Sequence, residues 1–175
     1  FTVTLRFERS ELQRSPMPDH DLTSPFVEFP QFHGHVLVAE DNPVNQALIT
    51  EMLEHFGCQV TLTADGQEVV EQFPQGRFDL VLMDLHMPGL DGYAATTAIR
   101  NIESDQDRQP TPIIALTADV LRGTREQCSN VGMNGYLSKP LTPEALLTAL
   151  QSHLKPSTSQ AQPRSIISNT KPQTS

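Results

Sequence analysis

Cysteine is scarce in this sequence. Among its 175 residues only Cys58 and Cys128 are cysteines, and they stand far apart, outside any CxxC or Cys/His spacing. Neither a disulfide framework nor a structural zinc site is therefore expected. Cysteines without a partner motif are typical of proteins from a reducing compartment, so we expect a cytoplasmic location.

Basic residues and long apolar runs are also few. The chain has 12 Lys and Arg against 21 Asp and Glu, which gives a formal net charge of −9. This balance argues against nucleic acid as a partner, because proteins that follow nucleic-acid phosphates need a basic surface. No run approaches the ~18 apolar residues of a membrane span, and the first residues lack the features of a signal peptide. We expect no direct membrane contact here; an anchor of the parent protein to the inner membrane would lie outside this stretch.

The two ends of the chain differ in composition from its middle. Residues 1–9 alternate apolar and other side chains and predict one strand, which we interpret as the last strand of a preceding domain. Residues 10–33 hold prolines among polar residues without a regular period, which indicates a linker. Residues 156–175 are rich in Ser, Thr, Gln and Pro and predict a disordered tail or a further linker. Residues 34–155 then form one domain of ordinary size.

Short apolar runs alternate with amphipathic stretches throughout that domain. The apolar runs predict strands at residues 35–39, 58–63, 78–83, 112–116 and 135–137. The stretches between them predict helices at residues 43–56, 66–73, 93–103, 120–130 and 143–154. Five successive strand–helix units are typical of an α/β fold with a doubly wound parallel sheet.

The first predicted helix has the clearest signals. Asn42 is a suitable cap and Pro43 suits the first turn. We expect one face of this helix to pack on the core through Val44, Leu48, Met52 and Phe56.

Polar and charged residues follow the apolar runs. In a doubly wound sheet the ligand site lies beyond the carboxyl ends of the strands. The candidates there are Glu40, Asp41, Asp84, Thr117 and Lys139. Adjacent carboxylates repel one another unless a cation lies between them, and Mg²⁺ is the economical inference. A carboxylate such as Asp84 can act as a nucleophile toward phosphorus, and Lys139 with the Thr117 hydroxyl can contact the transferred oxygens.

Each of these residues has an ordinary structural interpretation when it is taken alone. An acidic pair before a helix is favourable without any metal. Asp84 could be a turn residue, Thr117 a helix cap and Lys139 a surface lysine. Their joint occurrence at the ends of four predicted strands favours a phosphoryl-transfer site.

The candidate residues lie in four strings: VLVAEDNPVNQ, DLVLMDLHMPGLDG, PIIALTAD and GMNGYLSKP. These strings resemble the response regulator receiver family, and most closely the receivers attached to hybrid sensor histidine kinases. The resemblance covers about residues 34–154. It implies a flavodoxin-like sheet of five parallel strands in the order 2-1-3-4-5. It also implies a domain that catalyses its own phosphorylation and dephosphorylation, with Asp84 as the phosphorylated residue.

The same resemblance implies a metal shell and a distinctive proline. Asp41 and Asp84 would be direct metal ligands, Glu40 would bind the metal through water, and the main-chain carbonyl of His86 would complete the protein's share of the ligands. The bond between Lys139 and Pro140 is expected to be cis.

A two-state switch is implied as well. Phosphorylation would draw the Thr117 hydroxyl inward while the ring of Tyr136 changes rotamer. His86 and Asp119 stand at two positions that tune the lifetime of the acyl phosphate in this family.

The implied partners are a histidine kinase domain, in the same longer chain, and a histidine phosphotransfer domain or protein. The string FTVTLRF at residues 1–7 is similar to the last strand of a kinase ATP-binding domain. The flanks offer no helix-turn-helix and no basic face for a DNA-binding output.

Two further functions compete with the phosphorelay receiver. An aspartate-nucleophile phosphatase of the haloacid-dehalogenase kind needs a second Asp two residues after the nucleophile, where this chain has His86. A receiver-shaped module that regulates a kinase by binding, without being phosphorylated, is the main alternative. Such modules usually lose an acidic, Thr or Lys position, and this chain retains them all.

Overall fold

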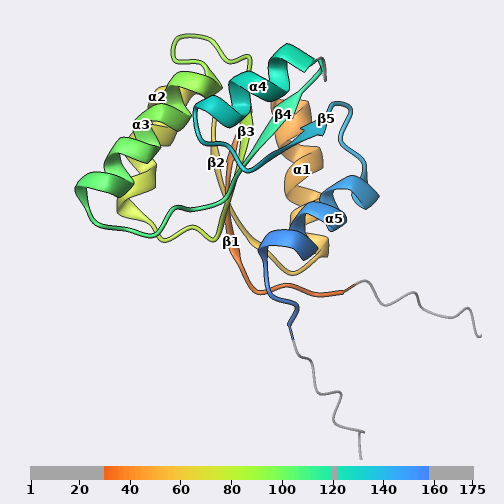
Figure 1. Cartoon of the computed structure of the whole chain (residues 1–175). Helices are drawn as coiled ribbons and strands as arrows, with labels where there is room; N and C mark the ends of the chain where they lie inside the picture. The colour runs from red at the N-terminus through yellow and green to blue at the C-terminus, as the bar shows by residue number, and fades with distance from the viewer. Residues whose placement is uncertain (1–29, 120–121, 158–175) are drawn as a thin grey trace, which may run out of the picture.

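The computed structural model describes residues 30–119 and 122–157 of the chain (Figure 1). The strands are β1 (His35–Ala39), β2 (Gln59–Thr63), β3 (Leu80–Asp84), β4 (Ile113–Thr117) and β5 (Gly135–Ser138). The helices are α1 (Pro43–His55), α2 (Gly66–Gln72), α3 (Gly92–Asp105), α4 (Arg122–Asn130) and α5 (Pro143–His153), with a short 3₁₀ helix, η1 (Phe73–Gln75), after α2. All ten elements predicted between residues 35 and 154 are therefore present.

The sheet is parallel throughout and has the order β2-β1-β3-β4-β5, which confirms the predicted fold. Every residue of β3 and β4 is buried, as expected for the central strands of a sheet covered on both faces. Both strands end one residue later than their apolar runs suggested. Asp84 and Thr117 are thus the last residues of their strands and not the first residues after them.

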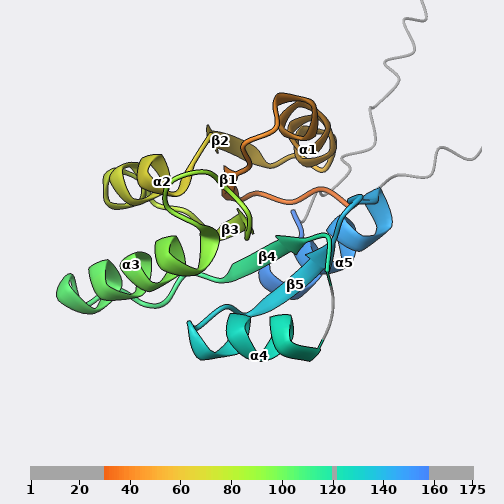
Figure 2. The same ribbon diagram turned by 90° about the horizontal axis from the view of Figure 1, so that it is seen from above.

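Helices cover both faces of the sheet. Figures 1 and 2 show α1 and α5 on one face and α2, α3 and α4 on the other. Successive strand residues point to opposite faces, so Val36 and Val38 pack with the α1 side, whereas Leu37 and Ala39 pack with the α2 side. Two apolar cores of this kind hold the strand ends in fixed positions.

Helix α1 begins as predicted but buries a different face. The side chain of Asn42 accepts a hydrogen bond from the Val44 amide at 2.9 Å, and Pro43 occupies the first turn. The predicted core stripe is correct for Met52 and Phe56 and wrong for Val44 and Leu48, whose exposed fractions are 73% and 45%. Residues spaced by four drift about 40° around a helix at every step, so a run of such steps leaves the core face. The buried positions are Ile49, Met52, Leu53 and Phe56, which mix spacings of three and four.

Two backbone features shape the loops beside the carboxyl ends of the strands. The peptide bond between Lys139 and Pro140 is cis, as expected. Gly92 begins α3 so close to β3 that a Cβ atom there would lie 2.2 Å from the main-chain oxygen of Asp84. A residue without a side chain is therefore needed where α3 packs on the end of β3.

The predicted strand at residues 1–9 lies outside the described residues, as do most of the predicted linker and most of the predicted tail. Phe32, inside the predicted linker, is fully buried and its amide donates to the carbonyl of Phe56 at 2.8 Å. Packing of the domain thus includes this residue. Within residues 30–119 and 122–157, no helix is long and apolar enough to cross a membrane.

Candidate phosphoacceptor site

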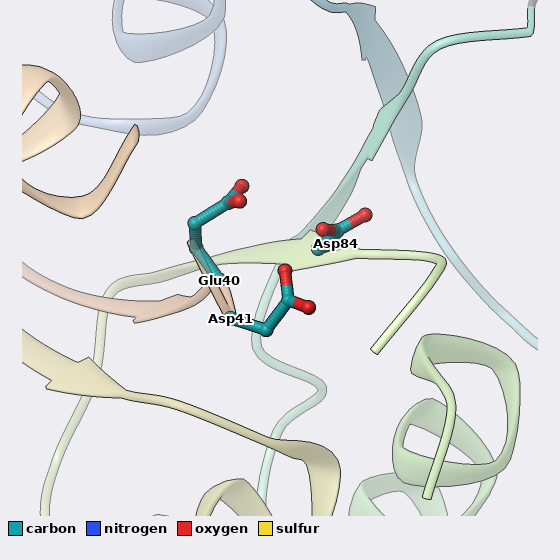
Figure 3. A group of neighbouring side chains, drawn as sticks. All are labelled: Glu40, Asp41 and Asp84. Atoms are coloured by element: carbon teal, nitrogen blue, oxygen red, sulfur yellow. The ribbon is translucent and has the colours of Figure 1, made fainter. Parts of the chain in front are cut away.

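Three carboxylates meet where β1 and β3 end. Glu40 and Asp41 follow β1, Asp84 ends β3, and these two strands are paired in register. One oxygen from each side chain lies within 4.8 Å of the others (Figure 3). Glu40 and Asp84 are buried, whereas Asp41 is exposed. Like charges so close together, two of them shielded from water, require a compensating cation.

Lys139 supplies a positive charge between the two buried carboxylates. Its Nζ lies 2.6 Å from Oδ2 of Asp84 and 2.6 Å from Oε2 of Glu40. Burial acts to lower the pKa of Lys139, but the two nearby carboxylates, Asp84 and Glu40, outweigh it and raise the pKa above its ordinary value. The ammonium group is therefore fully charged at neutral pH and directed at the carboxylate of Asp84.

The first turn of α1 fixes Glu40. The Asn45 side-chain amide donates to Oε1 of Glu40 at 2.8 Å, and the Gln46 side-chain amide donates to its main-chain oxygen at 2.6 Å. Oε2 of Glu40 is fully buried; it contacts Lys139 as an ion pair but accepts no hydrogen bond of good geometry. A buried carboxylate oxygen with unused accepting capacity, beside two further carboxylates, fits the donor set of a hard divalent cation.

Asp84 is held by the loop that follows it. The main-chain amide of His86 donates to Oδ1 of Asp84 at 3.1 Å. The side chain of His86 itself is exposed. His86 thus reaches the site through its backbone, which is also the part of the residue that the receiver resemblance implicates.

Thr117 lies at the same edge of the sheet, but its hydroxyl is engaged elsewhere. Oγ1 donates to the carbonyl of Asp119 at 2.9 Å and accepts from the amide of Asp119 at 3.0 Å. The residue is completely buried. To donate to an atom bound to Asp84, the hydroxyl would have to give up its bond to the Asp119 carbonyl.

Tyr136 stands on the neighbouring strand. The β4–β5 register pairs Ala115 with Tyr136 and Thr117 with Ser138. Tyr136 is half-buried against the core on the α2, α3 and α4 side of the sheet. The guanidinium of Arg125, from α4, lies over its ring at 4.6 Å from the centroid.

The structure thus brings four of the predicted residues, Glu40, Asp41, Asp84 and Lys139, into direct proximity. Sequence reasoning missed the residues that hold them in place. Asn45 and Gln46 could have been found, because polar residues in the first turn of a helix lie close to the strand end before it. Arg125 carried no comparable signal, since its contact with Tyr136 joins a helix to a strand through packing alone.

Comparison with known proteins agrees with this geometry. A family model described as the response regulator receiver domain matches residues 36–151. The chain belongs to the response regulator receiver family. The receiver domain of sensor histidine kinase PA1611 from Pseudomonas aeruginosa, solved with a magnesium ion in its active-site cleft, is 46% identical with a TM-score of 0.63, over 69% of this chain and 97% of that one.

Other relatives include a receiver solved in a complex and part of a sensor kinase. A chain in the co-crystal structure of the Saccharomyces cerevisiae phosphotransfer protein Ypd1 and the receiver domain of Ssk1 is 32% identical with a TM-score of 0.67, over 71% of this chain and 90% of that one. The sensor protein GacS of Pseudomonas syringae is 40% identical over 63% of this chain. This match covers 12% of the length of GacS.

Proposed function

We propose that this receiver is the phosphoacceptor of a phosphorelay, with Asp84 taking a phosphoryl group from a phosphohistidine in the presence of Mg²⁺. One observation carries the proposal. Asp84 is a buried carboxylate at a strand end, paired with the Lys139 ammonium at 2.6 Å and bordered by the acidic pair Glu40 and Asp41. This arrangement offers a nucleophile, a fixed positive charge and a cation site at one point.

The proposed chemistry is a single displacement at phosphorus. A carboxylate oxygen of Asp84 forms a bond to phosphorus while the bond from phosphorus to the donor imidazole nitrogen breaks. That nitrogen keeps the electron pair and takes up a proton from solvent. Lys139 is already within hydrogen-bond distance of Asp84. Its ammonium can therefore bind and stabilise the negatively charged oxygens of the new phosphoryl group.

The carboxylate cluster and the family support one set of metal ligands. Asp41 and Asp84 would bind Mg²⁺ directly, Glu40 through water, and His86 through its main-chain carbonyl. The ion would neutralise negative charge on the transferring phosphoryl group and on the three carboxylates. The magnesium in the cleft of the Pseudomonas receiver supports this choice of ion.

Thr117 and Tyr136 are proposed to change conformation when Asp84 is phosphorylated. In the present structure both hydrogen bonds of the Thr117 hydroxyl go to the Asp119 backbone. A phosphoryl group on Asp84 would add strong acceptors nearby, toward which the hydroxyl can turn. The ring of Tyr136, one strand away and only half-buried, would then change rotamer.

The exposed side of α1 is proposed to receive a histidine phosphotransfer partner. Val44 and Leu48 are among the most exposed large apolar residues of the described chain, and they lie on the helix that begins beside Asp41. Leu48 also lines a groove of about 370 Å³ between α1 and the start of α5, together with Met52 and Leu141. The Ypd1 co-crystal structure with a similar receiver supports a partner of this kind.

Replacing Leu48 by aspartate should block transfer between proteins and leave phosphorylation by a small molecule unchanged. A charge in the apolar groove opposes burial of that face, and Leu48 is not one of the residues of the carboxylate cluster. Wild type and variant are loaded with acetyl phosphate and Mg²⁺, mixed with purified Ypd1, and followed by intact mass. Leu62→Asp is the matched control, because Leu62 is 39% exposed on β2, away from the groove. Equal transfer by the two variants would show that α1 is not part of the docking surface.

The parent protein is proposed to be a hybrid sensor histidine kinase that acts in the cytoplasm. The matched relatives are kinases of which this receiver spans a small part, 12% for GacS. Cys58 and Cys128 are free and buried, which suits a reducing compartment. A binding module that is never phosphorylated has no observation in its favour, since the acidic, Thr and Lys positions are all present and grouped.

A further inference from the structure

Helix α4 is attached firmly at one end. Arg100, on α3, donates from Nε and Nη2 to the carbonyl of Gly132 and from Nη2 to the side chain of Asn134, just after α4. It also donates to the carbonyl of Thr111 before β4. The end of α4 nearest Gly132 is therefore tied to both α3 and the sheet.

The middle of α4 is attached by weaker contacts. Cys128 packs in the core on this face of the sheet, in the same apolar cluster as Tyr93 on α3. Arg125 contacts the face of Tyr136, with its guanidinium 4.6 Å from the ring centroid. Arg125 is exposed, so this pair spans the surface between α4 and β5. A guanidinium over an aromatic face is attracted by the negative charge of that face, and the attraction depends on the position of the ring.

We infer that Arg125 restrains Tyr136 in its present rotamer and so opposes the phosphorylated conformation of this receiver. The inference rests on the proposed function, in which Tyr136 changes rotamer when Asp84 is phosphorylated. Moving the ring away from Arg125 removes the contact, and the contact therefore stabilises only the unphosphorylated state. Arg125 is a positioning residue. It sets the equilibrium between the unphosphorylated and the phosphorylated conformation without touching the carboxylates.

The expected size of the effect follows from the strength of guanidinium–aromatic pairs at exposed sites. Losing the Arg125 contact should shift the two-state equilibrium roughly two- to fivefold toward the phosphorylated conformation. A ligand that prefers this conformation must bind more tightly by up to the same factor, because the two equilibria are linked.

The test uses beryllofluoride, a non-covalent analogue of a phosphoryl group on aspartate, in saturating Mg²⁺. The protein is labelled with 3-fluorotyrosine and observed by fluorine NMR; it has only two tyrosines, Tyr93 and Tyr136, so two signals report on the molecule. Titration gives the apparent affinity, and the Tyr136 signal gives the rotamer population. Arg125→Gln should bind beryllofluoride roughly two- to fivefold more tightly than wild type, with its free Tyr136 signal displaced toward the bound position. Arg125→Lys, which keeps a cation at this site, should restore most of the wild-type behaviour.

Arg108 provides a matched control. Its guanidinium lies 5.0 Å from the centroid of the Phe73 ring. It also donates to the carbonyl of Gly76, which precedes β3, so Arg108 lies toward the opposite end of that strand from Asp84. Arg108→Gln removes the same charge and the same kind of contact as Arg125→Gln. Because the Arg108 contact is with Phe73 and not with Tyr136, this variant should leave the affinity for beryllofluoride unchanged. Wild-type affinity in Arg125→Gln, or an equal change in Arg108→Gln, would overturn the role of Arg125. Failure of the wild-type protein to bind beryllofluoride with Mg²⁺ would instead overturn the proposed function, and with it this inference.

Discussion

Replacing Lys139 by methionine should slow the phosphorylation of Asp84 roughly 10²- to 10³-fold, the usual cost of removing one fixed donor from a site where charge develops. Lys139 contacts the Asp84 carboxylate at 2.6 Å and has the only side-chain charge paired with both buried acids in the described residues. Methionine keeps most of the length and apolar stem of the lysine but removes its charge. The rate is measured with acetyl phosphate in saturating Mg²⁺, by intact mass over time.

The control for this experiment is Lys155→Met, since Lys155 is an exposed lysine outside the site. It should react at the wild-type rate. The Lys139 variant should also be less stable without Mg²⁺, because Glu40 and Asp84 lose their shared counter-charge, and Mg²⁺ should restore more stability to it than to wild type. A rate within about threefold of wild type would show that Lys139 does not stabilise the transferring group.

The pH dependence of this pairing has a defined sign. The folded-state pKa of Lys139 is raised above 10.5, its ordinary value. The stability contributed by the pairing is therefore complete below about pH 10 and is lost as the pH rises through the folded-state pKa. Between neutral pH and about pH 9, Lys139 should produce no change in stability.

Replacing Arg100 by methionine should lower the free energy of unfolding by roughly 3 kcal/mol, because it leaves a buried carboxylate without its cation. Glu103 has a side chain only 2% exposed, and its Oε2 lies 2.6 Å from Nη1 of Arg100. Oε1 of Glu103 keeps a hydrogen bond from the Thr111 amide at 2.6 Å, which places the loss at the lower end of the usual range. Urea unfolding of both proteins measures the difference.

A second substitution separates charge from packing at this position. Changing Glu103 to glutamine in the Arg100→Met background removes the uncompensated charge and should recover part of the lost stability. Arg77→Met is the surface control, since Arg77 is exposed, and it should change stability by no more than about 0.5 kcal/mol. If Arg100→Met alone were equally mild, the Arg100–Glu103 pair would not support the domain.

The strand-end residues could be predicted from sequence because the topology of the sheet brings them together. Once alternating strands and helices indicated a parallel sheet, Glu40, Asp84 and Lys139 had to lie at one edge. The resemblance to receivers then supplied roles for Thr117 and Tyr136, which no spacing could have given.

Other features depend on side-chain packing and escaped prediction. The spacing of apolar residues in α1 predicts a buried face that includes Val44 and Leu48, but both residues are exposed. The buried and the exposed sets are both apolar, and packing against the sheet and α5 decides between them. The contacts of Arg100 and Arg125 join segments that have no periodic relation in sequence.

The most direct test of the central claim is whether Asp84 accepts a phosphoryl group that requires Mg²⁺. Wild type and Asp84→Asn are incubated with acetyl phosphate, each with Mg²⁺ or with EDTA, and their intact masses are compared. We expect one labile adduct of about 80 Da in the wild-type protein with Mg²⁺, and none in the other three samples. The same adduct on Asp84→Asn, or its absence from folded wild-type protein in Mg²⁺, would contradict the assignment of Asp84 as the phosphoacceptor.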